Sequence, residues 1–142
     1  MGPIAMTADY RYFDHEADIG IEAEGKTLEE AFVNAALAMF AIMAEPATVI
    51  PERRVSLAFD EADVELALVT WLNQLLAQAR VHGLIFCAYE LRREGDHWQG
   101  EAWGMPWRPE AERGTEVKGA TLTQLKVEPG GKGWRVRCVV DV

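Results

Sequence analysis

The feature that most constrains this chain is a two-residue period in hydrophobicity near both of its ends. Apolar positions alternate with polar residues or glycine over residues 18–24 and again over residues 134–142. Alternation of this kind predicts β-strands with one face on a core and the other in water. Asp18 lies on the polar phase where the first of these strands begins, and Asp141 lies on the polar phase where the last one ends. If the two strands are neighbours, the two carboxylates meet.

Two segments between these strands carry the signals of helices. The sequence Thr27-Leu28-Glu29-Glu30 is a capping box and opens a helix predicted over residues 27–45. Acidic residues open a second predicted helix, over residues 62–82, which ends before Gly83. Apolar residues recur at helical spacing in both segments, so each helix is expected to bury one face.

The rest of the 142 residues reads as strands, turns and one loop. The sequence predicts a loop over residues 105–114, and it predicts further strands over residues 10–13, 55–59, 84–91, 98–103 and 116–128. Residues 1–8 carry no pattern and are expected to be frayed. Runs of strands with two inserted helices predict an α+β fold, in which two helices pack on one face of a largely antiparallel sheet. A chain of this length fits a single domain, residues 1–142, with one core.

Composition and cysteine content narrow the class of protein. Hydrophobic residues make up 49% of the chain. No apolar run approaches the roughly 20 residues that a membrane span needs, and the first 15 residues do not have the pattern of a signal peptide. A cytoplasmic protein that does not contact a membrane is therefore expected. Cys87 and Cys138 each lie in an apolar run, which favours buried free thiols over a disulfide.

The charge is strongly acidic and unevenly distributed. The formal net charge is −9, and residues 1–79 hold 14 acids and 4 bases, whereas residues 80–142 hold 9 acids and 10 bases. Binding to phosphate backbones needs clustered Lys and Arg, so independent nucleic-acid binding is not expected. An acidic face would instead attract cations or a basic partner.

Four ionisable residues take the polar phase of the predicted strands: Asp18, Glu116, Lys118 and Asp141. Any one-sided sheet has a polar phase by default, so this pattern alone is also explained by simple exposure to solvent. The final residue, Val142, adds its α-carboxylate to the same strand end as Asp141. Converging carboxylates repel unless a cation lies between them, and hard oxygen ligands suit Ca²⁺, Mg²⁺ or Mn²⁺.

No catalytic residue is predicted. The chain has no Ser/His/Asp spacing, no P-loop, no glycine-rich dinucleotide turn and no CxxC or HExxH sequence, so it offers no recognisable nucleophile. His15 is a candidate ligand or base, and a structural hydrogen bond is the alternative role for a histidine placed just before a strand.

Three blocks of the sequence resemble the archease family. His15-Glu16-Ala17-Asp18-Ile19-Gly20 is similar to the family's His-Thr-Ala-Asp-Ile-Gly opening. Thr115-Glu116-Val117-Lys118-Gly119-Ala120-Thr121 is similar to its Thr-Glu-Val-Lys-Ala-Val-Thr segment, and Val139-Val140-Asp141-Val142 to its terminal Val-Asp-Val. The chain departs from the family in having Glu16 in place of Thr, Met105 where Glu is frequent, and no His in the loop at 105–114.

The resemblance implies an accessory protein that is not itself an enzyme. Its partner would be the GTP-dependent RNA-splicing ligase, which joins RNA ends carrying a 3′-phosphate or a 2′,3′-cyclic phosphate in tRNA splicing and RNA repair. The family promotes ligase guanylylation and multiple turnover and binds a divalent metal, which is Ca²⁺ in some structures; for this chain Ca²⁺ is expected first, with Mn²⁺ or Mg²⁺ as alternatives. Carried over by residue, Asp18, Asp141 and Val142 would be metal ligands, and His15, Glu116 and Lys118 would activate the partner.

Two other classes of function remain open from the sequence. A small metal-dependent hydrolase could use the same carboxylates, although the missing nucleophile or base disfavours it. A general chaperone would need exposed apolar surface, for which Trp98, Trp103 and Trp107 are the candidates.

Overall fold

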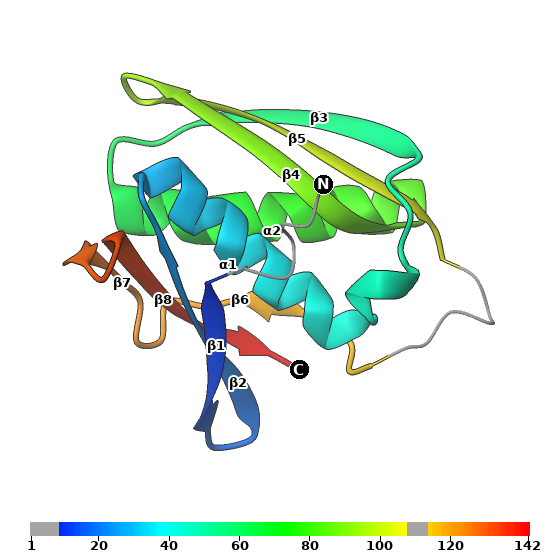
Figure 1. The fold of residues 1–142 in the computed structure, drawn as a ribbon, viewed down its shortest axis with the longest axis horizontal. Coiled ribbons are helices and arrows are strands. Elements are labelled where there is room, and N and C mark those ends of the chain that lie inside the picture. Colours follow the sequence, from blue (N-terminus) through cyan, green and yellow to red (C-terminus); the bar gives the residue numbers. More distant parts are fainter. Residues whose placement is uncertain (1–8, 108–113) are drawn as a thin grey trace.

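A computed structural model of the chain describes residues 9–107 and 114–142, so the expectation for residues 1–8 lies outside the described residues. Within these ranges the strands form a three-stranded sheet and a five-stranded sheet, and the α-helices lie between the two sheets (Figure 1). The elements in chain order are β1 Tyr10–His15, β2 Asp18–Gly25, α1 Leu28–Met43, the 3₁₀ helix η2 Pro46–Thr48, β3 Arg53–Asp60, α2 Val64–His82, β4 Leu84–Glu94, β5 His97–Pro106, β6 Gly119–Ala120, β7 Lys126–Gly130 and β8 Gly133–Asp141.

The two alternating segments at the ends of the chain are neighbours in the five-stranded sheet. Its order is β1-β2-β8-β6, and β7 also pairs with β8, with every pairing antiparallel. Strands β2 and β8 pair over seven positions, from Ile19 opposite Val140 to Gly25 opposite Trp134. The second sheet has the order β3-β5-β4 and is also antiparallel.

The α+β class and the antiparallel pairing are confirmed, but the strands form two sheets instead of the single sheet expected. The helices lie between the sheets (Figure 1), and α1 contacts both of them. On one side Phe40 meets Phe86 of β4 with ring centroids 5.5 Å apart. On the other side the Tyr12 hydroxyl of β1 donates to the carbonyl of Ala38 at 2.7 Å. A helix used on two sides must be apolar around most of its circumference.

Capping residues set the start of both helices and the end of α2. The Thr27 hydroxyl accepts from the Glu30 N–H at 3.1 Å, as the capping box predicts. Asp63 caps α2 by accepting from the N–H groups of Glu65 and Leu66. Gly83 ends α2 with φ of 66°, a left-handed conformation that glycine adopts without strain.

Some predicted strand limits were wrong. The expected strand over residues 116–128 is interrupted, because only Gly119–Ala120 and Lys126–Gly130 pair with β8. Strand β5 continues to Pro106, so the start of the expected loop at 105–114 is part of a sheet, and residues 108–113 lie outside the described residues. Sequence alternation reports which face of a segment is apolar, and it does not report whether a neighbouring strand is in reach.

The buried side chains of both helices and both sheets form one cluster. Both cysteines are free, as expected: Cys138 is buried and Cys87 is half-buried. Burial raises the pKa of the Cys138 thiol to about 11, so it stays protonated at neutral pH. None of the helices in the described part of the chain is long and apolar enough to cross a membrane.

The position of α2 gives a first prediction. Leu72 is fully buried, whereas Leu66 on the same helix is 42% exposed. Leu72→Ala should lower the free energy of unfolding by roughly 2–5 kcal/mol, because a buried leucine leaves a cavity. Leu66→Ala is the matched control and should cost less than about 1 kcal/mol. Urea denaturation measures both, and a Leu72→Ala loss no larger than that of the control would contradict the packing described here.

Candidate functional site

The β2–β8 pairing brings Asp18 and Asp141 to the same end of the sheet. They occupy the positions next to the pair Ile19–Val140, and directly opposed residues on antiparallel strands have Cβ atoms about 4.5–5.5 Å apart. The N–H of Val142 donates to Oδ1 of Asp18 at 3.4 Å. Asp18, Asp141 and Val142 therefore form one group, which we call the acidic tip.

The tip is positioned by a tight hairpin between β1 and β2. His15 pairs with Asp18, which leaves only Glu16 and Ala17 in the loop. Glu16 has φ of 53°, the left-handed conformation that two-residue hairpin loops require. The hairpin fixes where β2 begins, and it therefore fixes where the Asp18 carboxylate lies.

Gly20, two residues further along β2, has a packing role. The ring of Phe13 on β1 occupies the space beside it, and a Cβ at position 20 would lie 2.2 Å from ring atoms. The guanidinium of Arg137, on β8, lies over the Phe13 ring at 4.3 Å from the ring centroid. The glycine of the His15–Gly20 block thus lets an aromatic ring cover the sheet directly beside the tip.

The carboxylates of the tip differ from their neighbours on the same sheet because they lack basic partners. Glu22 and Glu24 each form an ion pair, with Arg137 and Arg135 respectively, at 3.6 Å. Within residues 9–107 and 114–142, neither Asp18 nor Asp141 forms an ion pair. Two carboxylates on neighbouring strand ends repel each other, and here no basic side chain of the described residues balances them. The tip therefore attracts a cation.

The segment that carries Glu116 and Lys118 lies beside the tip. Both side chains are exposed and Val117 between them is buried, which is the predicted alternation. The N–H of Lys118 donates to the carbonyl of Asp141 at 2.8 Å. Next along the segment, Gly119 pairs with Asp141 in the β6–β8 ladder. The structure therefore brings Glu116 and Lys118 close to the metal ligands predicted from the sequence.

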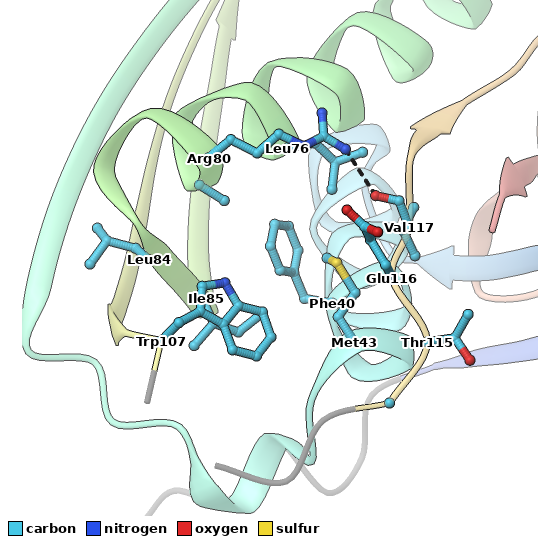
Figure 2. A pocket seen from close by; sticks show the side chains of 12 residues that line it. Phe40, Met43, Leu76, Arg80, Leu84, Ile85, Trp107, Thr115, Glu116 and Val117 are labelled. Carbon is cyan, nitrogen blue, oxygen red and sulfur yellow. Dashed lines mark hydrogen bonds between the residues drawn. The ribbon is translucent and has the colours of Figure 1, made fainter. Parts of the chain in front are cut away.

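Two polar residues of α2 hold this segment in place, and sequence reasoning did not identify them. Nη2 of Arg80 donates to the carbonyls of Val117 at 3.0 Å and Lys118 at 2.9 Å, the first of which Figure 2 shows. Asn73 donates to the carbonyl of Ala120 at 3.1 Å and accepts from its N–H at 2.8 Å. One sequence feature could have pointed to them: Asn73 and Arg80 are seven residues apart, which places both side chains on one face of the helix.

His15 is half-buried at the loop end of the hairpin, opposite Asp18. Its Nδ1 atom is buried, and it has no hydrogen-bond partner among the described residues. Within the described part of the chain, the Nδ1 atom of His15 therefore does not make the structural hydrogen bond that was the alternative role for this residue. A role for His15 in activating a partner stays a prediction.

The donor chemistry of the tip fits a hard divalent cation. Ca²⁺ binds about six to eight oxygen ligands. The tip offers two carboxylates and a main-chain oxygen of Val142, so water or a partner would supply the other ligands. Within the described ranges, no three His, Cys, Asp or Glu side chains are grouped to hold a metal. The Val142 oxygen is therefore essential to the predicted set, and metal binding by this set stays a prediction.

Comparison with known proteins assigns the chain to a family. Residues 10–142 match the archease protein family. Protein archease of Methanosarcina acetivorans is 36% identical over 139 residues, covering 94% of this chain and 95% of that protein. Protein archease of Sulfurisphaera tokodaii is 34% identical over 136 residues, covering 94% and 98%. The chain belongs to the archease family.

Two solved structures are similar to the fold. The solution structure of Methanobacterium thermoautotrophicum protein 1598 has a TM-score of 0.79 and 28% identity, covering 94% of this chain and 98% of that one. The crystal structure of a Thermotoga maritima archease, titled a possible chaperone, has a TM-score of 0.64 and 21% identity, covering 92% and 94%. The second likeness concerns the fold alone.

The contacts of Asn73 generate a second prediction. Asn73→Ala leaves both polar groups of the half-buried Ala120 backbone without their side-chain partner, so it should lower the free energy of unfolding by about 1–2 kcal/mol. The adjacent Gln74 makes no hydrogen bond through its side chain within the described residues, and Gln74→Ala should change the stability by no more than about 0.5 kcal/mol. Equal effects of the two substitutions in urea denaturation would contradict the role given to Asn73.

Proposed function

We propose that this chain is a non-catalytic activator of a GTP-dependent RNA-splicing ligase, and that it acts through a divalent cation held at the acidic tip. The proposal rests on one observation: Asp18, Asp141 and Val142 lie at the same end of the sheet, and the N–H of Val142 donates to Asp18. Family membership supports an accessory role, and the identity of the ligase as partner comes from the motif resemblance.

The ligands and the partner-facing residues have separate roles in this proposal. Asp18, Asp141 and a main-chain oxygen of Val142 would hold Ca²⁺, with Mn²⁺ or Mg²⁺ as alternatives. The cation would supply a concentrated positive charge that can be shared with phosphate or carboxylate oxygens of a partner. Glu116 and Lys118, exposed beside the tip, would contact the ligase, and His15, opposite Asp18 in the hairpin, would take part in activating it.

The acidic surface supports a protein partner over free RNA. The net charge of −9 opposes the approach of a polyanion. A basic, metal-dependent nucleotide cleft would attract the same surface. The ligase therefore provides the contact with RNA in this proposal, and the accessory chain acts on the ligase.

The two alternative functions receive less support. A metal-dependent hydrolase needs a positioned base, and the only histidine at the tip, within the described ranges, is the half-buried His15. A general chaperone needs exposed apolar surface, but Trp98 is fully buried and Trp103 and Trp107 are half-buried. In the part of the chain that the structure describes, the large exposed apolar residues are spread over β1, α2 and two connecting segments: Tyr12, Ile50, Leu66, Val81 and Leu122.

Asp18→Ala tests the proposal. A cation bound only by the folded state stabilises it by RT ln(1 + [L]/Kd), so Ca²⁺ or Mn²⁺ should raise the Tm of the wild type and not of this variant. Without metal the variant should be as stable as the wild type or slightly more stable, because one of two repelling carboxylates is removed. Ligase guanylylation should lose most of its stimulation.

Asp14→Ala is the matched control for this experiment. Asp14 is an exposed acid of the same hairpin, and its pairing with Ile19 places it on the opposite face of the sheet from Asp18. The control should keep both the metal-dependent rise in Tm and the stimulation of the ligase. A folded Asp18→Ala protein that stimulates the ligase as fully as this control would end the proposal.

A further inference from the structure

A pocket of about 260 Å³ lies between α1, α2 and the start of β4, and residues 114–117 close one side of it. Phe40, Leu76 and Ile85 form buried apolar walls, as Figure 2 shows. Trp107 and Glu116 stand at the rim on opposite sides. Drug-sized ligands generally occupy pockets of roughly 300–1,000 Å³. The volume here suits one large apolar side chain better than a nucleotide or a cofactor.

The rim carries a carboxylate without a side-chain partner among the described residues. Glu116 is exposed, and it forms no ion pair or side-chain hydrogen bond within residues 9–107 and 114–142. Arg80 also lines the pocket, but its Nη2 is held by the carbonyls of Val117 and Lys118. An occupant is therefore favoured when it joins an apolar group to a positive charge, because the apolar part fills the pocket and the cation meets Glu116.

The pocket and the acidic tip belong to one surface. Glu116 and Val117 line the pocket, and the next residue, Lys118, is hydrogen-bonded to Asp141 through its N–H. The carbonyl bonds of Arg80 fix the backbone between the two features. Protein interfaces draw much of their affinity from a side chain that fills a dry pocket, surrounded by polar contacts.

We propose that this pocket receives an apolar side chain from the partner protein of the acidic tip, and that a Lys or Arg beside that side chain pairs with Glu116. The identity of the partner as the ligase rests on the proposed function. The pocket would supply affinity and register for the complex, and the tip would supply the cation.

Filling the pocket tests this assignment. Ala79 lines the pocket near the end of α2, and Val81 on the same helix is 76% exposed and does not line it. Ala79→Leu should raise the concentration needed for half-maximal stimulation of ligase guanylylation by at least about tenfold, which corresponds to one displaced anchor contact. Val81→Leu should leave that concentration unchanged. The metal-dependent shift in Tm should be the same in both variants and in the wild type, because neither residue belongs to the tip.

The outcomes separate this inference from the proposed function. If the wild type itself fails to stimulate the ligase, the proposed function is wrong. If the wild type stimulates and folded Ala79→Leu has the same half-maximal concentration, the pocket assignment is overturned. Ala79→Met, which fills the same space with an adaptable unbranched side chain, is the second variant. Failure of both variants to fold would also overturn the assignment, because it would show that the pocket has no room for an added side chain.

Discussion

The pairing of β2 with β8 is the interaction on which the candidate site depends. It joins residues near the two ends of the chain, and Asp18 and Val142 are in hydrogen-bond contact although 124 positions separate them in sequence. Because side chains alternate along each strand, a shift of the register by one residue would turn either Asp18 or Asp141 to the opposite face and separate the carboxylates. The buried alternate positions, such as Ile21 opposite Cys138, hold that register through the core. The geometry of the tip is thus a consequence of core packing several residues away.

The candidate site also depends on α2, which holds the irregular backbone of residues 114–120 in place. Residues 114–120 make only a two-residue ladder with β8, so strand pairing alone would hold them weakly. Asn73 and Arg80 supply further hydrogen bonds to this backbone from one face of the helix. Polar side chains that bond backbone groups in this way fix a segment and leave its own side chains exposed. Glu116 and Lys118 can therefore be rigidly placed while remaining available to a partner.

Much of this arrangement could be predicted from the sequence, and the exceptions have physical reasons. Capping chemistry and periodicity are local, so both helices and the phases of Asp18 and Asp141 followed directly from their neighbours in sequence. The division into two sheets did not, because alternation carries no information on which strands pair. The clearest overlooked signal was α1 itself, whose buried residues surround most of its circumference and require a cover on both sides. Arg80 and Asn73 were missed because their partners are backbone groups 37 to 47 residues away in sequence, which no side-chain pattern marks.

We propose that the β2–β8 pairing builds a cation site from Asp18, Asp141 and Val142. A crystal structure of the protein grown with Mn²⁺, with an anomalous difference map, measures this most directly. We expect one strong peak at the end of the β2–β8 ladder, in direct contact with carboxylate oxygens of both Asp18 and Asp141 and with a main-chain oxygen of Val142. A map without a peak there, or carboxylates more than about 8 Å apart and so beyond the reach of one ion, would contradict it.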